Sequence, residues 1–189
     1  MQDWSKLKLG IVVALVTLGG TVLAGIASVA GVVLTGTEEF CSTACHSMNI
    51  PAAEFKDTIH DTNRTGVRAT CADCHIPHHS VVAMLVTKTK AGIKDIYGEM
   101  TGVIDTKEKY EKERYGMAVQ VWTVMKQTDS RECRHCHTPA KMNPEKQSET
   151  ARKKHEALKS GGMTCIDCHF GIAHSEPDGP GPQELKVAK

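Results

Sequence analysis

The sequence predicts a mainly α-helical protein in which a single N-terminal transmembrane helix carries a compact domain of two similar halves, with little or no sheet. A long uncharged apolar run lies near the N-terminus, and strand-like alternation of apolar and polar residues is almost absent elsewhere. Cysteine pairs recur along the chain in two sets that resemble each other. We expect an anchor over residues 1–36, the domain over 37–175, and a flexible tail rich in Pro and Gly over 176–189.

The anchor is predicted from a stretch without charged residues between Lys8 and Glu38, rich in Val, Leu, Ala, Ile and Gly. It exceeds the ~20 residues with which an α-helix crosses a hydrocarbon core. Lysines precede the run and glutamates follow it, so the positive-inside rule places the N-terminus in the cytoplasm and the domain outside. A cleaved signal sequence is the alternative, but the run is longer than the apolar region of such a signal. Glycines within the run allow close helix approach, which would permit a homo-oligomer through the anchor.

All eight cysteines fall into four pairs, and a histidine directly follows each pair, within residues 41–46, 71–75, 133–137 and 165–169. The first pair has three intervening residues and the others have two. Such motifs attach c-type haem, because the thiols form thioethers and the histidine ligates the iron. Zinc sites and disulfide scaffolds also use paired cysteines, but neither requires the histidine. We therefore predict four covalently bound haem c groups, held by Cys41, Cys45, Cys71, Cys74, Cys133, Cys136, Cys165 and Cys168.

The spacing of the motifs indicates an internal duplication into two dihaem halves, at about residues 37–80 and 130–175. The segment before the second motif, with Thr-Cys-Ala-Asp-Cys-His, is echoed before the fourth by Thr-Cys-Ile-Asp-Cys-His. Residues 81–98 and 107–127 have helical composition and are expected to link the halves. Aromatic residues make up only 4% of the chain, so a conventional core would be thin and the porphyrins are expected to supply apolar bulk. The net charge of +1 gives no indication of a nucleic-acid partner.

Histidines outside the motifs are candidates for the second axial ligand of each iron. In each half one precedes the second motif and one follows it, which selects His60, His78, His155 and His174. They join the motif ligands His75, His137 and His169. His78 and His174 lie too close to the preceding motif histidine to reach around one porphyrin, so each should serve a different haem. His79 and His135 have no counterpart in the other half and are expected to have a surface or hydrogen-bonding role. For the first haem, either His46 or Met48 can be the ligand.

With these features in place, the chain resembles the NapC/NirT/NrfH family of membrane-anchored tetrahaem quinol dehydrogenases, most closely its NapC branch. The segments that carry the resemblance include EEFCSTACHSM, HDTNRTGVRATCADCHIPH, KDIYG and TCIDCHFGIAH. It implies oxidation of menaquinol or ubiquinol at the periplasmic face of the bacterial inner membrane. Electrons would pass to a soluble periplasmic reductase, which in the NapC branch is nitrate reductase. The resemblance also implies Met48 as the ligand of the first haem, although the three-residue spacing there departs from the family pattern.

Quinol oxidation releases two protons with two electrons, so its site needs a proton acceptor. Asp95 and Lys88 are seven residues apart and therefore share a helix face. The family's quinol site similarly uses a lysine and an acid on this helix, and Lys90 or Lys94 is an alternative to Lys88. Two rival functions are a terminal multihaem reductase of nitrite or hydroxylamine, acting at an open first haem, and a haem relay or anchor without its own quinol site.

Overall fold

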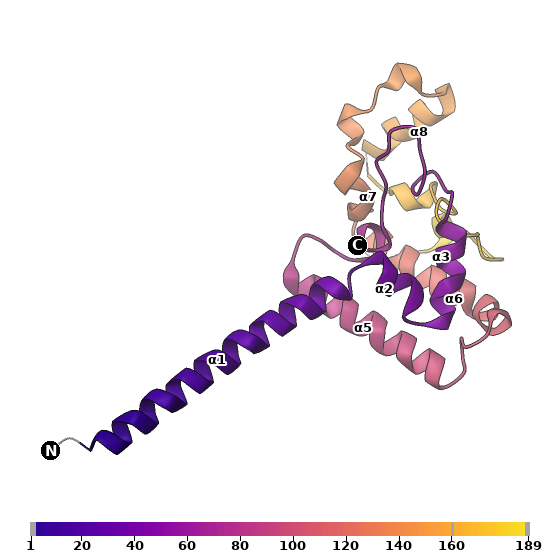
Figure 1. Ribbon diagram of the computed structural model, residues 1–189. Helices are drawn as coiled ribbons and strands as arrows, with labels where there is room; N and C mark the ends of the chain where they lie inside the picture. The colour runs from indigo at the N-terminus through magenta and orange to yellow at the C-terminus, as the bar shows by residue number, and fades with distance from the viewer. Residues whose placement is uncertain (1–2, 160, 188–189) are drawn as a thin grey trace.

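The structure, a computed structural model, describes residues 3–159 and 161–187, and those residues form helices, turns and loops without a strand. The predicted mainly α fold is confirmed. Helix α1 (Trp4–Leu34) projects from a body that contains all the other elements, as Figure 1 shows.

Helix α1 has the length and composition of a membrane span. At about 1.5 Å per residue, its 31 residues extend roughly 46 Å. Its mean hydropathy reaches 2.3 and none of its residues is buried, which makes it the one helix in the described chain suited to crossing a membrane. The helix ends where the backbone N–H groups of Thr35 and Gly36 bond back to the carbonyls of Gly31 and Val33.

Three short helices and one 3₁₀ turn carry the cysteine motifs. They are α2 (Glu38–Thr43), α4 (Cys71–His75), α7 (Arg131–Cys136) and η4 (Cys165–Asp167). The second and fourth begin with the same capping box, in which a threonine and an aspartate three residues later bond reciprocally. Thr70 and Asp73 form the first box and Thr164 and Asp167 the second. The two halves therefore share local structure as well as sequence.

Two long helices, α5 (Val81–Met100) and α6 (Lys107–Gln127), link the halves at nearly the predicted bounds. Each begins at a hydroxyl cap, because Ser80 and Thr106 accept hydrogen bonds from N–H groups of the first turn. Between the helices the chain reverses at Gly102, whose φ of 71° favours glycine. The turn packs closely, since a Cβ on Gly98 would lie 2.9 Å from Ile104.

The remaining short elements complete the body. They are η1 (His46–Met48), α3 (Asn49–Phe55), η2 (Pro139–Lys141), η3 (Pro144–Lys146), α8 (Glu149–Lys159) and η5 (Pro182–Glu184). The apolar side chains buried among the described residues are few: Phe55, Ile104, Trp122 and Ile166. Trp122 packs edge-on against Tyr115 and Phe170, with ring centres 6.4 and 5.9 Å away. So few buried apolar side chains are expected for a domain whose interior is filled by large apolar groups.

The segment expected to be a flexible tail is docked on α6 as far as it is described. Pro182 is fully buried, and Tyr115 Oη donates a hydrogen bond to the carbonyl of Pro180. Lys126 Nζ donates to the carbonyls of Pro182 and Leu185 at 2.6 and 2.9 Å. The composition of the tail does not reveal these contacts, because they depend on residues more than 50 positions earlier in the chain.

Candidate functional site

The four motifs lie in order, each beside the next. Helix α2 packs against α4, and α4 packs against α7. The Ile166 N–H in the fourth motif donates a hydrogen bond of 3.1 Å to Ser130 Oγ at the start of α7. Ser130 is fully buried and has a left-handed backbone with φ 49°, so this junction between the third and fourth motifs is closely fitted.

The pKa values of the cysteine thiols also indicate that each motif lies beside the next. Burial raises the pKa of the Cys71 thiol, and the nearby Cys41 of the first motif adds to the shift. Burial also raises the pKa of Cys74 to about 11, with Cys133 as the next contributor. The pKa of Cys133 is raised by burial and then by Cys165 of the fourth motif. Neighbouring motifs are thus within electrostatic reach, while none of the eight thiols is joined in a disulfide.

The extra residue in the first motif changes its backbone. In the second motif both cysteines lie on one short helix, with the usual three-residue step between them. In the first, α2 ends at Thr43 and Cys45 is extended, with φ −129° and ψ 142°. His46 is exposed there, whereas Met48 is half-buried. Ser47 is buried and its N–H donates to Glu99 Oε1 on α5 at 2.8 Å.

Three motif histidines each face one histidine from outside the motifs, with ring centres 6.1 Å apart in every case. The pairs are His75 with His174, His137 with His60, and His169 with His155. In the pairs His75–His174 and His137–His60, the two histidines come from distant parts of the chain. Sequence spacing selects these histidines but does not reveal which belongs with which.

His78 lies in a different environment from the other three candidates. Its ring stacks on that of His135, with centres 5.8 Å apart and planes inclined by 23°. Its Nε2 is also 3.3 Å from the Ala72 carbonyl and 3.8 Å from the Asp73 carboxylate. His78 thus faces a histidine that has no motif role, while its neighbour His79 is exposed.

A hydrogen bond orients one histidine that faces a motif, and ion pairs hold the loop that carries another. His155 Nδ1 lies 2.8 Å from Gln147 Oε1, which leaves its other ring nitrogen free for a metal. His174 is followed by Ser175, whose N–H donates to Glu54 Oε2 at 3.2 Å. Glu54 is in turn held by the buried Arg114 through two bonds of 2.6 and 2.9 Å. Arg114 also bonds Glu111, so the loop that carries His174 is tied to both α3 and α6.

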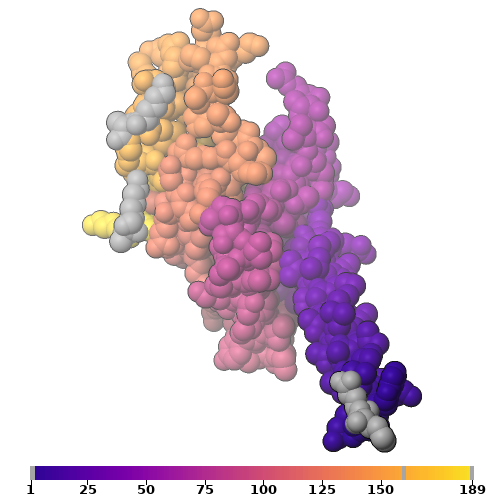
Figure 2. Space-filling model, turned by 90° about the vertical axis from the view of Figure 1, so that its left-hand side faces the viewer, coloured from indigo at the N-terminus to yellow at the C-terminus, as the bar shows by residue number. Residues whose placement is uncertain are grey.

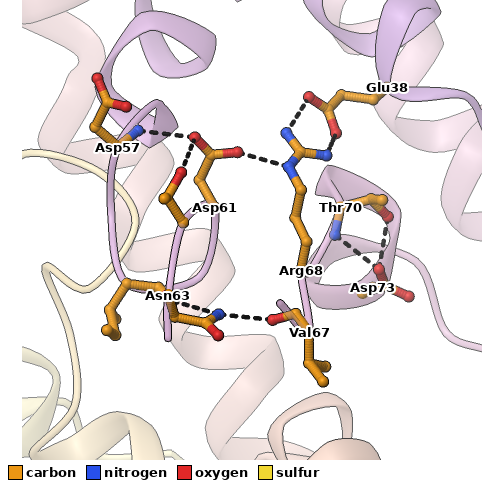
Figure 3. A network of polar contacts seen from close by, with 10 residues as sticks. Glu38, Asp57, Asp61, Asn63, Val67, Arg68, Thr70 and Asp73 are labelled. Carbon is orange, nitrogen blue, oxygen red and sulfur yellow. Dashed lines mark hydrogen bonds and ion pairs between the residues drawn. The ribbon is translucent and has the colours of Figure 1, made fainter. Parts of the chain in front are cut away.

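A second arginine holds the segment that carries His60. Figure 3 shows Arg68 between two carboxylates, with both terminal nitrogens on Glu38 and Nε on Asp61, at distances of 2.5 to 2.6 Å. Asp61 also accepts a hydrogen bond from the Asp57 N–H. Because Glu38 opens α2 and Asp61 follows His60, Arg68 joins the first motif to the histidine that faces the third. Neither arginine was selected by sequence reasoning, since long-range pairing leaves no local pattern.

Helix α5 presents Lys88 and Asp95 to the first motif. The carboxylates of Glu99 and Asp95 lie close enough to the Cys45 thiol to raise its pKa further, after the larger effect of burial. After the larger effect of burial, which raises the pKa of the Cys41 thiol, the charge of Lys88 has the next effect and lowers that pKa. Lys88 Nζ donates to the Val32 carbonyl of α1 at 2.6 Å, a favourable position for a cation at a helix C-terminus.

Asp95 is half-buried, and the pKa of its carboxyl group is raised. Burial raises the pKa of its carboxyl group, Lys94 opposes this effect, and Glu99 adds to the increase. Lys94 is exposed and its ammonium bonds Gln120 of α6, while Lys90 is also exposed. Of the three lysines considered for this site, Lys88 is therefore the one that faces the first motif.

Comparison with known proteins assigns the family. Residues 3–179 match the model of the NapC/NirT cytochrome c family, N-terminal region. The chain belongs to the NapC/NirT cytochrome c family. It is 42% identical over 196 residues to the denitrification system component NirT of Stutzerimonas stutzeri, covering 94% of this chain and 95% of the relative. It is 45% identical over 175 residues to the cytochrome c-type protein NapC of Escherichia coli K12, covering 92% and 86%.

A third relative bears on the cofactor. A protein of Allochromatium vinosum whose name describes a tetraheme cytochrome-c type is 48% identical over 150 residues, covering 79% of this chain and 80% of the relative. No solved structure matches the chain. This member of the NapC/NirT family is a membrane-anchored electron-transfer cytochrome with covalently bound haem c.

The paired histidines fit the bound group. Because metal–imidazole bonds are about 2 Å long and a ring centre lies ~1 Å beyond its nitrogen, two imidazoles on opposite sides of one iron have centres roughly 6 Å apart. The three separations of 6.1 Å meet this requirement. The His78–His135 rings have a similar separation of 5.8 Å, but neither is the histidine that directly follows a cysteine pair, so this pair is not assigned to a haem.

Proposed function

We propose that this cytochrome oxidises quinol at the periplasmic face of the bacterial inner membrane and passes the electrons to a periplasmic reductase, with nitrate reductase as the first candidate. The observation that carries the proposal is the convergence of Asp95 and Lys88 on the first motif, next to the point where α1 leaves the membrane. The lysines before α1 and the glutamates after it support a cytoplasmic N-terminus. The relatives named NapC and NirT support a role in nitrogen-oxide respiration.

Four haems are assigned to the four motifs, and bound haem c supplies one-electron carriers with no open position wherever the iron has two axial ligands. His75 and His174 would ligate the second, His137 and His60 the third, and His169 and His155 the fourth. Met48, half-buried beside the first motif, is the proposed ligand there in preference to His46, as the resemblance to the family implies. His78 has no place in this assignment, because it faces His135.

The quinol site is proposed on the edge of α5 that faces the first motif. Asp95 would accept a proton from a quinol hydroxyl, and its raised pKa makes the carboxylate a stronger base than an ordinary aspartate. Glu99, adjacent to Asp95 and bonded to Ser47, is a route for that proton to leave. Lys88 would bind the quinol oxygen in exchange for its bond to the Val32 carbonyl.

A terminal reductase of nitrite or hydroxylamine is the less favoured function. Such a reaction needs an iron with an open face, and three of the four motifs have a second histidine at ligand distance. The remaining motif lies beside acidic side chains, which disfavour an anionic substrate such as nitrite. A haem relay without its own quinol site is the third function, and the following experiment separates it from the first.

Asp95→Asn should slow reduction by a menaquinol analogue by about 10²–10⁴-fold, the usual contribution of a positioned general base. Reduction by dithionite should be unchanged, because dithionite needs no proton acceptor. Stopped-flow absorbance of the haem bands measures both rates, and Glu113→Gln, an exposed acid on α6, is the matched control. In the unchanged protein, the quinol rate should rise with pH through a pKa above that of an ordinary aspartate and then level off.

Quinol oxidation at the normal rate by Asp95→Asn, with all haems retained, would contradict the role of Asp95. If the unchanged protein itself fails to accept electrons from quinol, the relay without a quinol site is correct. Lys88→Ala should weaken the apparent affinity for quinol more than the maximal rate, whereas Lys90→Ala, which removes an exposed lysine of the same helix, should change neither.

A further inference from the structure

One side of α5 is apolar along its length except at the exposed Thr89, and it faces away from the body. The side chains recur at helical spacing, and the stripe consists of Val82, Leu85, Val86, Ile93, Ile96 and Met100. Val82, Ile93 and Met100 are 70%, 63% and 83% exposed, so these groups lie in contact with the surroundings instead of the core. A long contiguous apolar stripe on the surface of a protein marks an interaction site.

The borders of the stripe are polar in the pattern of a helix that lies in a membrane surface. Lys90 is exposed along one border, where its apolar stem can lie against acyl chains while the ammonium group reaches water. Tyr97, which is 67% exposed, adds an aromatic ring of the kind that favours the headgroup region. The opposite border carries Lys88 and Asp95, which face the first motif.

The position of α5 selects lipid as the occupant. Lys88 bonds the Val32 carbonyl, so the first half of α5 lies at the level of the last turn of α1. Figure 1 shows α5 crossing the end of α1 on the side of the body from which α1 projects. In Figure 2 the residues of α5, in magenta, lie at the surface beside the upper part of α1. The stripe therefore continues the apolar surface of a helix that is itself a membrane anchor.

We propose that α5 is a second membrane-contacting element, an amphipathic helix that lies in the outer interface of the bilayer with this stripe among the acyl chains. The inference follows from the anchor and the exposed stripe and does not depend on quinol chemistry. It adds a consequence for the proposed function, because a quinol moving laterally in the bilayer would meet the Lys88–Asp95 border without leaving lipid.

The test uses the full-length holoprotein in phospholipid nanodiscs that contain a phospholipid with a diazirine in its acyl chain. After irradiation, mass spectrometry of the digest locates the residues to which lipid is attached. We expect adducts on α1 and on the stripe of α5, including Val86 and Ile93. Residues on the opposite side of α5, such as Thr87, and the exposed Lys112 of α6 should remain unmodified.

A paired variant sharpens the result. Val86→Glu with Ile93→Glu should lower lipid attachment to α5 several-fold without changing attachment to α1, whereas Lys112→Glu should change neither. Both variants change exposed side chains, and their haem content by mass verifies folding. Adducts confined to α1 in the unchanged protein would overturn the proposal.

Discussion

At the scale of single residues, ring geometry separates histidines that have identical chemistry. His174 faces a motif histidine at the separation of two ligands on one iron, whereas His135 is stacked on His78. His174→Ala should therefore convert one haem from low to high spin, and His135→Ala should convert none. Electron paramagnetic resonance of the oxidised protein measures this. A high-spin signal from His135→Ala, or none from His174→Ala, would contradict the assigned pairs.

Arg114 is the side chain on which the position of His174 depends most. Its guanidinium is 10% exposed and holds two carboxylates, so its removal leaves Glu54 partly buried and unpaired. Arg114→Met should lower the free energy of unfolding by roughly 3–5 kcal/mol, as for other broken buried pairs. Urea titration followed by circular dichroism gives the value.

The matched control for Arg114 is Lys109→Met. Lys109 lies on the same helix as Arg114, and its replacement breaks an exposed ion pair with Asp105. The free energy of unfolding should fall by about 0–1 kcal/mol. If the two variants lose the same free energy of unfolding, the buried Arg114 ion pairs stabilise the protein no more than the exposed Lys109 pair does.

Residue-level predictions from sequence were limited by the range of each contact. The shared helix face of Asp95 and Lys88 follows from their seven-residue spacing, because helical geometry is local, while their choice as a quinol site rests on the family resemblance. The capping aspartates Asp73 and Asp167 also follow a local rule, threonine three residues before an acid. Arg68 pairs with Glu38, 30 residues away in the sequence, and Arg114 pairs with Glu54, 60 residues away. Local sequence patterns do not predict ion pairs over such separations.

At the scale of elements, the linking helices could be predicted because the helical composition of each segment and the break at Gly102 are local features of the sequence. The first was expected over 81–98 and extends to Met100, where the Gly102 turn stops it. The structure of the C-terminal tail, in contrast, could not be predicted from local sequence features. Its Pro and Gly content favours an extended chain, but burial of Pro182 and the bonds from Lys126 fix it to α6.

Lys126 is the side chain that fastens the tail. Its ammonium also pairs with the nearly buried Asp167 at 2.7 Å, so one cation joins α6, the fourth motif and η5. Hydrogen bonds to charged groups contribute ~1.5–3 kcal/mol each, so Lys126→Met should speed amide exchange of residues 182–187 by at least about tenfold. Hydrogen–deuterium exchange with mass spectrometry measures the change.

Lys153→Met, which removes an exposed pair with Glu149 in α8, is the control for the tail and should leave its exchange unchanged. Unaltered protection of the tail in Lys126→Met would show that Pro182 burial alone holds it in place.

At the scale of the whole molecule, the anchor, α5 and the first motif lie at one end, and the motifs follow one another from there. Helix α2 contacts α4, α4 contacts α7, and Ser130 at the start of α7 contacts the fourth motif, so these contacts connect the four motifs in sequence order. We expect a protein with this arrangement to pass electrons from the membrane end toward the fourth motif, where a soluble reductase could approach.

This order predicts what happens when the third motif is removed. The double variant Cys133→Ala, Cys136→Ala should retain three haems by mass and accept electrons from quinol rapidly into two of them, because the fourth lies beyond the break. The matched variant Cys165→Ala, Cys168→Ala also retains three haems, and all three should be reduced rapidly. Stopped-flow absorbance with a menaquinol analogue counts the haems reduced in the fast phase. Rapid reduction of all three haems in the Cys133→Ala, Cys136→Ala protein would show a direct route from the first two motifs to the fourth, and would replace the linear arrangement with a branched one.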